Sequence, residues 1–239
     1  MMISFRADLS RADYWVLSAV TALEESLKFN NANLSSNFIS PVKFTFKYGR
    51  CDCPTSPYTN ISRGFPSGHS DFNQVMDFFS REFGFNMRES VAILGAHTLG
   101  GASGSAGSGF GGFWKESSVA AGRLNNRYYS LLADRRLFWS NLDQSVVNGF
   151  SRERWQWVAG VTPGGVPAPF MLNADVALIR DIQPDRTGRS ACQFRECVAS
   201  PSAGIVEEYA RDGNLWITEF SRVWEKMVER GARGLRFPV

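Results

Sequence analysis

His97 is the residue of this chain best placed to bind a metal. It is one of two histidines in 239 residues, and it follows an apolar run that includes Ile93 and Leu94. The segment 89–99 lacks proline, which predicts a helix, and spacings of three and four residues put these side chains on one helix face. The imidazole would project from the last helical turn into an apolar pocket, where it can ligate iron.

Small residues surround this histidine. Gly95 and Ala96 leave room for a flat ligand against the helix face, and Gly100 and Gly101 suit the end of the helix because glycine adopts backbone conformations that other residues resist. A lone histidine near a helix end is more often a partner of the helix dipole or a half-buried structural residue. Spacing alone leaves both interpretations open.

The string from Val91 to Gly101 resembles the proximal-haem helix of the plant, fungal and bacterial haem peroxidase superfamily. It is most similar to the branch that holds cytochrome c peroxidase and ascorbate peroxidase. The resemblance implies one haem b, with His97 as the ligand of its iron. It also implies that the haem lies against Ile93, Leu94, Ala96, Gly100 and Gly101.

A second segment, residues 171–181, is similar to the family's segment that carries an aspartate beside the proximal histidine. The resemblance implies that Asp175 receives the second N–H of His97 and that Leu172 lies at the haem. A carboxylate there fixes the tautomer, orients the ring and makes the ligand more basic. Taken alone, Asp175 would more often be the N-cap of a helix over 176–179. Beside the His97 motif, we favour the first role.

Trp114 resembles the tryptophan that lies against the proximal histidine in that branch of the family. The resemblance implies that its indole is hydrogen-bonded to Asp175 and relays an electron. The chain has one more residue between His97 and Trp114 than the resemblance leads us to expect, and most tryptophans simply pack in a core. In the glycine-rich loop between them, Ser103 and Ser108 could reach haem propionates, with a solvated loop serine as the alternative.

The resemblance extends over nearly the whole chain. Residues 9–17 are similar to the helix that follows the distal region, and residues 205–227 to the C-terminal helices. The loop 65–68 is similar to the loop that approaches the haem edge, which implies a haem contact for Pro66. We therefore expect a single domain over residues 1–239, with a mainly α haem peroxidase fold whose helical layers surround one haem.

The distal catalytic pair of the family has no counterpart near the start of this sequence. In the family, a distal histidine moves a proton between the peroxide oxygens, and a distal arginine stabilises the charge on the departing one. No histidine accompanies Arg6, and His69 falls in the loop 66–71, where we expect a solvated side chain. We expect an N-terminally truncated fold, from a truncated gene model, a splice form or a natural non-catalytic descendant. If Met1 is the true start, we expect exposed apolar surface and weak peroxide turnover.

Two hypotheses of different class follow. The first is a haem peroxidase that reduces hydrogen peroxide, as in a response to oxidative stress, with electrons from ascorbate, a phenol or a small redox protein. The alternative is a non-catalytic haem-binding or structural protein that keeps only the proximal half. An upstream coding segment with an arginine and, a few residues later, a histidine would favour the first.

Composition excludes several partners. The net charge is +3 and the isoelectric point is near 8.7, which names no acidic partner and is too mild to argue for nucleic acid. No apolar stretch approaches the length of about 18 residues that indicates a membrane helix, and the N-terminus lacks a signal-like apolar region. We expect neither a nucleic-acid nor a membrane partner.

The four cysteines bear on the cellular compartment. Cys51 and Cys53 are too close in sequence to pair comfortably with each other, whereas Cys192 and Cys197 could form a disulfide. A zinc site is the alternative, but the spacing does not suit one and no histidine accompanies the cysteines. With two glycosylation sequons in loop-like segments, we favour disulfides and an extracellular, secreted location.

Helical patterns dominate the remaining sequence. Amphipathic helices are expected at 13–29, 123–133 and 214–230, and a further helix is expected after a cap at Ser70 or Asp71. Segments with helical spacing are separated by loops rich in glycine, proline and serine. Residues 41–48 alternate in polarity, which predicts a short strand at most.

Thr98 resembles the threonine that helps to bind a proximal cation in several members of the family. Lys115 and Asn125 lie near the positions of the other ligands, where oxygen ligands, some of them charged, would be needed. We therefore assign no cation to this site.

Overall fold

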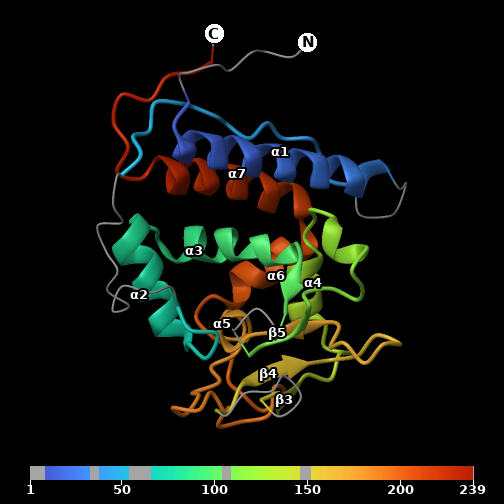
Figure 1. Ribbon diagram of the computed structural model, residues 1–239. Helices are drawn as coiled ribbons and strands as arrows, with labels where there is room; N and C mark the ends of the chain where they lie inside the picture. Colours follow the sequence, from blue (N-terminus) through green and yellow to red (C-terminus); the bar gives the residue numbers. More distant parts are fainter. Residues whose placement is uncertain (1–8, 33–37, 54–65, 104–108, 146–151, 239) are drawn as a thin grey trace.

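The computed structural model describes residues 9–32, 38–53, 66–103, 109–145 and 152–238. The fold is mainly α, as predicted, and Figure 1 shows α1 (Arg11–Ala32) and α7 (Gly213–Glu229) at one end of the molecule and strands β3 (Ser140–Asp143) and β4 (Trp155–Val158) at the other. The helices are α1 (Arg11–Ala32), α2 (Phe72–Phe83), α3 (Met87–Leu94), α4 (Arg127–Ala133), α5 (Asn173–Val176), α6 (Ala203–Arg211) and α7 (Gly213–Glu229).

Helices α3, α4, α6 and α7 pack on one another around a shared core. Fully buried aromatic rings fill the space between them: Tyr129 lies 5.2 Å from Tyr209 and 5.8 Å from Trp216, centroid to centroid, in edge-to-face arrangements. Large buried rings contribute much apolar surface to a core and fix the relative placement of the elements that carry them. The position of α3, which leads to His97, is therefore set by the helices around it.

The expected helices are present, with ends set by their caps. Asp71 accepts a hydrogen bond from the backbone N–H of Gln74, whose side chain bonds back to the N–H of Asp71, and this capping box begins α2. The helix expected at 123–133 begins only at Arg127, after a 3-10 turn over Ala120–Gly122. Residues 41–47 form no strand, and Tyr48 makes a single antiparallel bridge to Arg236.

The last turn before His97 is a 3-10 helix, Gly95–Thr98, rather than a continuation of α3. The Tyr129 hydroxyl donates to the carbonyl of Val91 (2.7 Å), and the Trp216 indole donates to that of Ala92 (3.2 Å). These side chains satisfy carbonyls at the end of the α-helix, where the chain tightens. The helix predicted over 89–99 is thus present, but it changes from an α-helix to a 3-10 helix at Gly95.

Short antiparallel strands complete the fold. β1 (Gly101–Ala102) pairs with β2 (Gly112–Phe113), and β3 (Ser140–Asp143), β4 (Trp155–Val158) and β5 (Phe170–Met171) form a second sheet in that order. Strands of two to four residues carry too little alternation to be predicted from the sequence. The second sheet positions the site, because β5 is followed within two residues by α5, which carries Asp175.

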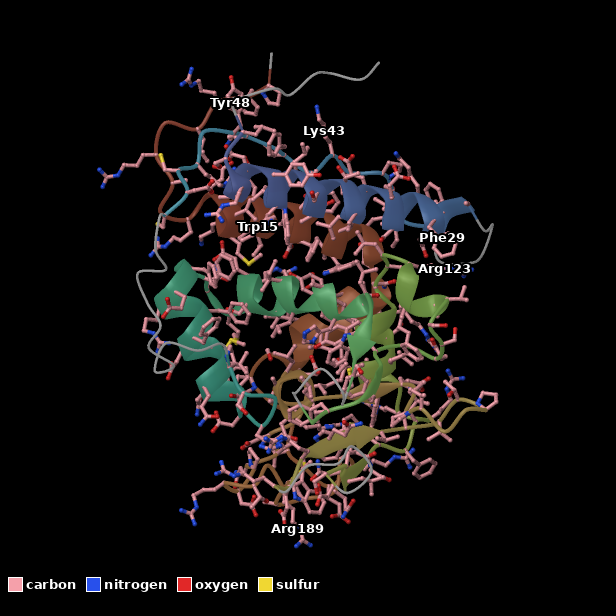
Figure 2. The ribbon with its side chains drawn as sticks, in the orientation of Figure 1. Trp15, Phe29, Lys43, Tyr48, Arg123 and Arg189 are labelled. Atoms are coloured by element: carbon pink, nitrogen blue, oxygen red, sulfur yellow. A yellow bond between two sulfur atoms is a disulfide. The ribbon has the colours of Figure 1, made fainter. Side chains whose placement is uncertain are left out.

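Helix α1 presents large apolar side chains to solvent. Tyr14 is 63% exposed and Trp15, labelled in Figure 2, is 70% exposed. At its other end, the guanidinium of Arg123 lies over the ring of Phe29, 5.3 Å from the centroid (Figure 2). Among the described helices, none is both long enough and apolar enough to cross a membrane.

Candidate haem-binding site

His97 and Asp175 lie in direct contact although 78 residues separate them. His97 comes from the 3-10 turn after α3, Asp175 is the third residue of α5, and Nδ1 of the imidazole is 2.7 Å from Oδ1 of the carboxylate. Asp175 is completely buried, whereas the side chain of His97 keeps 32% of its surface exposed. The imidazole is therefore anchored at one nitrogen and remains accessible.

This hydrogen bond decides which nitrogen of His97 is open to a metal. A carboxylate only accepts hydrogen bonds, so Nδ1 carries the ring proton and Nε2 keeps its lone pair. Within the described part of the chain, no hydrogen bond from Nε2 is recorded. A partly exposed imidazole with one nitrogen free and its N–H held by a buried carboxylate is the donor that haem iron takes, so the donor set fits a haem.

Asp175 accepts hydrogen bonds from two further groups. The hydroxyl of Tyr128 donates to Oδ1 (2.7 Å), the same oxygen that faces His97, and the backbone N–H of Leu172 donates to Oδ2 (2.7 Å). The second bond caps the start of α5, which begins at Asn173, so the alternative that Asp175 is the N-cap of a helix over 176–179 is wrong. The buried carboxylate is satisfied by three donors.

Tyr128 is the member of this cluster that the sequence analysis did not find. It is fully buried on α4, and its ring lies edge-on to His97 with centroids 6.1 Å apart. Burial, and then the neighbouring Asp175, raise the pKa of this hydroxyl well above its ordinary value, so it keeps its proton and donates. A tyrosine on the apolar face of the helix predicted at 123–133 was the available signal, since a buried hydroxyl needs a partner.

Trp114 lies flat against His97. Their ring centroids are 4.1 Å apart with planes inclined by 5°, and Phe170 stacks on the other face of the indole at 4.2 Å. Trp114 is 6% exposed. The expected hydrogen bond between its indole and Asp175 is not recorded among the described residues, where the donors to Asp175 are His97, Tyr128 and Leu172.

The other residues expected at a haem are placed around this centre in different environments. Ile93 and Leu94 are buried at the end of α3, and Ala96, Leu172 and Pro66 are partly buried. Gly100 has φ +76°, the left-handed conformation expected of a residue that ends a helix, and Gly101 pairs with Phe113 in β1. Ser103 is exposed, and Ser108 lies outside the described residues.

His69 differs from its expectation. It is half-buried rather than solvated, with its ring edge-on to Phe110 (5.2 Å) and its Nε2 buried without a partner among the described residues. Burial lowers the pKa of this imidazole, which favours its neutral form. The loop before α2 is packed against Phe110 and the chain near Gly188, and this contact is invisible in a local sequence pattern. Arg6 lies outside the described residues.

Lys115 occupies the position where a cation ligand was considered. Its side chain is buried, and Nζ donates to the carbonyl of Arg123 (2.5 Å) and to Oδ1 of Asn125 (3.3 Å). The Thr98 hydroxyl donates to the same Asn125 oxygen at 3.4 Å. The oxygens gathered here therefore face an amine that belongs to the chain itself. Burial lowers the pKa of Lys115 to about 7.

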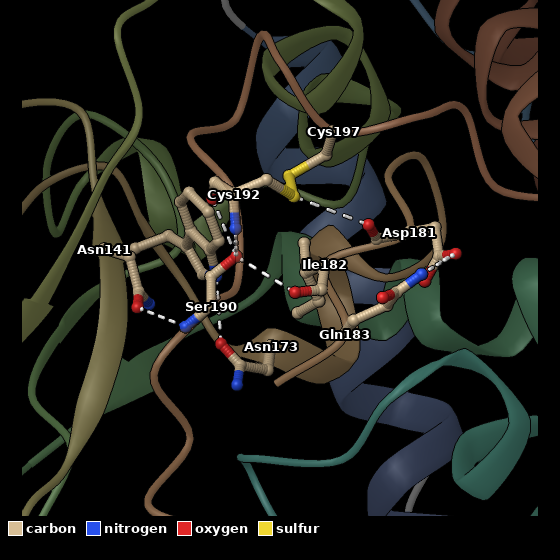
Figure 3. The surroundings of a disulfide bond; sticks show 9 residues. Asn141, Asn173, Asp181, Ile182, Gln183, Ser190, Cys192 and Cys197 are labelled. Carbon is tan, nitrogen blue, oxygen red and sulfur yellow. Dashed lines mark hydrogen bonds between the residues drawn. A yellow bond between two sulfur atoms is a disulfide. The ribbon is translucent and has the colours of Figure 1, made fainter. Parts of the chain in front are cut away.

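The predicted disulfide between Cys192 and Cys197 is present, and Cys51 and Cys53 are free and exposed. Figure 3 shows the bridge beside Ser190, whose hydroxyl donates to the carbonyls of Ile182 and Cys192. The bridge therefore closes a short, hydrogen-bonded turn. The sequons that begin at Asn33 and Asn60 lie outside the described residues.

In this mainly α fold, an imidazole is held by a buried carboxylate and lies against a flat indole. This arrangement is typical of proteins that bind a redox-active metal cofactor. The family model described as Peroxidase matches residues 4–190. This is most of the chain, and the protein belongs to the peroxidase family, within the haem peroxidase superfamily.

The similar proteins include mitochondrial cytochrome c peroxidases and proteins named putative heme-binding peroxidases. The chain is 28% identical to the mitochondrial cytochrome c peroxidase of Aspergillus fumigatus, over 93% of this chain and 47% of that protein. It is 28% identical to the mitochondrial cytochrome c peroxidase of Neurospora crassa, over 93% and 48%, and 25% identical to that of Candida albicans, over 94% and 48%. The chain spans about half the length of these curated relatives.

The expectation of a secreted protein is wrong. The relatives from Aspergillus fumigatus and Neurospora crassa are named mitochondrial cytochrome c peroxidases, which points to mitochondria rather than to secretion. The cysteine spacing and the sequons led to the wrong location because neither feature occurs only in secreted proteins. Two cysteines five residues apart can lie within bonding distance in any compartment.

Proposed function

We propose that this chain forms the haem-binding proximal part of a peroxidase that reduces hydrogen peroxide. The observation that carries the proposal is the 2.7 Å contact between Nδ1 of His97 and Oδ1 of Asp175, with Trp114 stacked on the imidazole. A haem b bound at Nε2 of His97 supplies the redox chemistry for peroxide reduction. Asp175 holds the Nδ1 proton, fixes the ring and raises the basicity of the ligand.

The remaining residues of the proposed haem site surround this pair. Ile93 and Leu94 are supported by their burial on the α3 side, and Leu172 by its hydrogen bond to Asp175. Further haem contacts are proposed for Ala96, Gly100, Gly101, Ser103, Ser108 and Pro66. In this proposal the domain is single and comprises residues 1–239.

A small redox protein of the cytochrome c class is the electron donor that we propose. Two observations support it: several relatives are named cytochrome c peroxidases, and Trp114 forms a stack with His97 and Phe170 along which an electron can pass. These cytochrome c peroxidases are named as mitochondrial, and we propose the same location for this chain.

A second candidate, a haem-binding protein that turns over peroxide poorly, is favoured by the position of His69. Peroxide cleavage needs a base that can reach the peroxide, and His69 is the one histidine besides His97. Its Nε2 is buried and its ring packs on Phe110.

Reaction of the haem-loaded chain with hydrogen peroxide separates the two candidates. Reduced cytochrome c, ascorbate and a phenol are offered separately, and donor oxidation is followed by absorbance. Oxidation of cytochrome c well above the rate of free haem supports the peroxidase and its donor class. Oxidation of ascorbate or the phenol alone corrects the donor, and a histidine-ligated haem that stays unchanged with peroxide supports the second candidate.

A further inference from the structure

The hydroxyl of Tyr128 competes with His97 for a single oxygen. Both groups lie 2.7 Å from Oδ1 of Asp175, and all three side chains meet where Tyr128 and Asp175 are fully buried. Oδ2 is occupied separately by the backbone N–H of Leu172. No other hydrogen bond of the Tyr128 hydroxyl is recorded in the described part of the chain, so its polar contribution is made at Asp175.

Two donors on one carboxylate oxygen weaken each other. Each hydrogen bond withdraws electron density from the carboxylate, and in a buried site this mutual effect is larger than in water. The pull of Asp175 on the Nδ1 proton of His97 is therefore smaller with the Tyr128 hydroxyl present than without it. A smaller pull leaves the imidazole less anionic and a poorer electron donor to a metal at Nε2.

We propose that Tyr128 is a positioning residue that sets the electron-donating strength of His97 through Asp175. This inference rests on the proposed haem site and deepens it. A less electron-rich axial ligand stabilises the lower oxidation state of iron, so the hydroxyl raises the reduction potential of the bound haem. Tyr128 thus limits the effect that Asp175 has on the ligand.

The chain offers a matched control at the next position. Tyr129 is equally buried on α4, but its hydroxyl donates to the backbone carbonyls of Val91 and Ala92 and not to Asp175. Tyr128→Phe and Tyr129→Phe each remove one buried hydroxyl and keep the ring. Only the first removes a donor from the carboxylate that holds His97.

The experiment measures the midpoint potential of the haem-loaded protein and the iron–histidine stretching band by resonance Raman. With Tyr128→Phe we expect a more negative midpoint potential. At a fixed solution potential, the ratio of reduced to oxidised haem should fall about three- to tenfold, and a tenfold change corresponds to about 59 mV for one electron. The stretching frequency should rise, since the stronger pull strengthens the ligand. Tyr129→Phe should change neither readout.

A double-mutant cycle with Asp175→Asn locates the effect. In the Asn background, Tyr128→Phe should no longer lower the potential, because the carboxylate through which it acts is gone. Three results would overturn the inference while leaving the haem site standing. They are an unchanged or higher potential in Tyr128→Phe, an equal shift of the potential in Tyr129→Phe, and the same shift for Tyr128→Phe in the Asn background. Failure of the unmodified chain to take up haem would overturn both.

Discussion

The indole of Trp114 lies flat against the imidazole of His97, with ring centroids 4.1 Å apart and planes inclined by 5°. With Phe170 on its opposite face, Trp114 is the middle ring of a stack that leads away from the proposed iron ligand. Close stacking provides electronic overlap, and burial keeps the indole from water. The same contact serves packing and electron transfer, so the two roles need separate measurements.

Trp114→Phe should preserve haem binding and slow oxidation of the donor protein. The phenyl ring keeps an aromatic contact with His97, but it is much harder to oxidise than indole. We therefore expect the rate of donor oxidation to fall at least about tenfold, which corresponds to an increase of about 1.4 kcal/mol in the activation barrier. Stopped-flow mixing with reduced cytochrome c and peroxide measures it. Trp139→Phe is the control, because Trp139 is equally buried but packs on Phe194. Equal rates in both variants would remove Trp114 from the electron path.

Asp175→Ala should weaken both the fold and haem binding. The variant leaves the Tyr128 hydroxyl, the Nδ1–H of His97 and the N–H of Leu172 without their acceptor, and each buried orphan costs about 1–3 kcal/mol. We expect the free energy of unfolding to fall by about 3 kcal/mol or more and haem affinity to fall about 10- to 100-fold. Urea unfolding and haem titration measure these, and unchanged haem affinity would contradict the role of Asp175.

Gly95→Ala should be strongly destabilising. A Cβ at this position would lie 2.5 Å from both the Trp216 indole nitrogen and the Tyr129 hydroxyl oxygen, at the point where α3 becomes a 3-10 helix. Overpacking of this kind costs about 1–3 kcal/mol. Gly204→Ala in α6 is the matched control, since nothing lies within 4 Å of its added Cβ, and alanine should raise stability by up to about 1 kcal/mol. Thermal unfolding of both variants measures these effects. Equal stability of Gly95→Ala and the unmodified protein would contradict the close contact at Gly95.

The buried amine of Lys115 makes stability depend on pH. Burial lowers its pKa in the folded protein from the ordinary 10.5 to about 7. Between these values the unfolded chain holds a proton that the folded protein has released, so stability rises with pH, by at most about 1.4 kcal/mol per pH unit. The contribution of the neutral Lys115 amine to the free energy of unfolding is complete above pH 10.5 and is lost as the pH falls towards 7.

Urea unfolding at pH 7, 8 and 9 tests this dependence. Lys115→Met removes the titrating amine while keeping an unbranched side chain, so the rise of stability with pH should be smaller in the variant. Parallel curves for the two proteins would show that Lys115 keeps its proton, held by the Arg123 carbonyl and Asn125.

Local patterns predicted the helices because the signals that start and stop them are short. Asp71 and Gln74 form the capping box of α2, and Gly100 takes the left-handed conformation after the turn that carries His97. The short strands escaped prediction because their pairing, such as Gly101 with Phe113, depends on contacts across a loop rather than on alternation.

The site was predictable only in part. The association of His97 with Asp175 came from resemblance to a family, since no spacing rule joins residues 78 positions apart. The bond from Tyr128 to Asp175 and the burial of His69 were missed, because both follow from packing between elements distant in sequence. The resemblance also directed the Trp114 indole to Asp175, a bond not recorded among the described residues, where Tyr128 donates instead.

The most direct test of the haem site uses the two histidines of the chain. Haem is titrated into the unmodified protein, His97→Ala and His69→Gln, and stoichiometry and the Soret spectrum are recorded for each. We predict one haem with a histidine-ligated spectrum in the unmodified protein and in His69→Gln, and loss of that stoichiometric spectrum in His97→Ala. An unchanged haem content and spectrum in His97→Ala would contradict the assignment of His97 as the iron ligand.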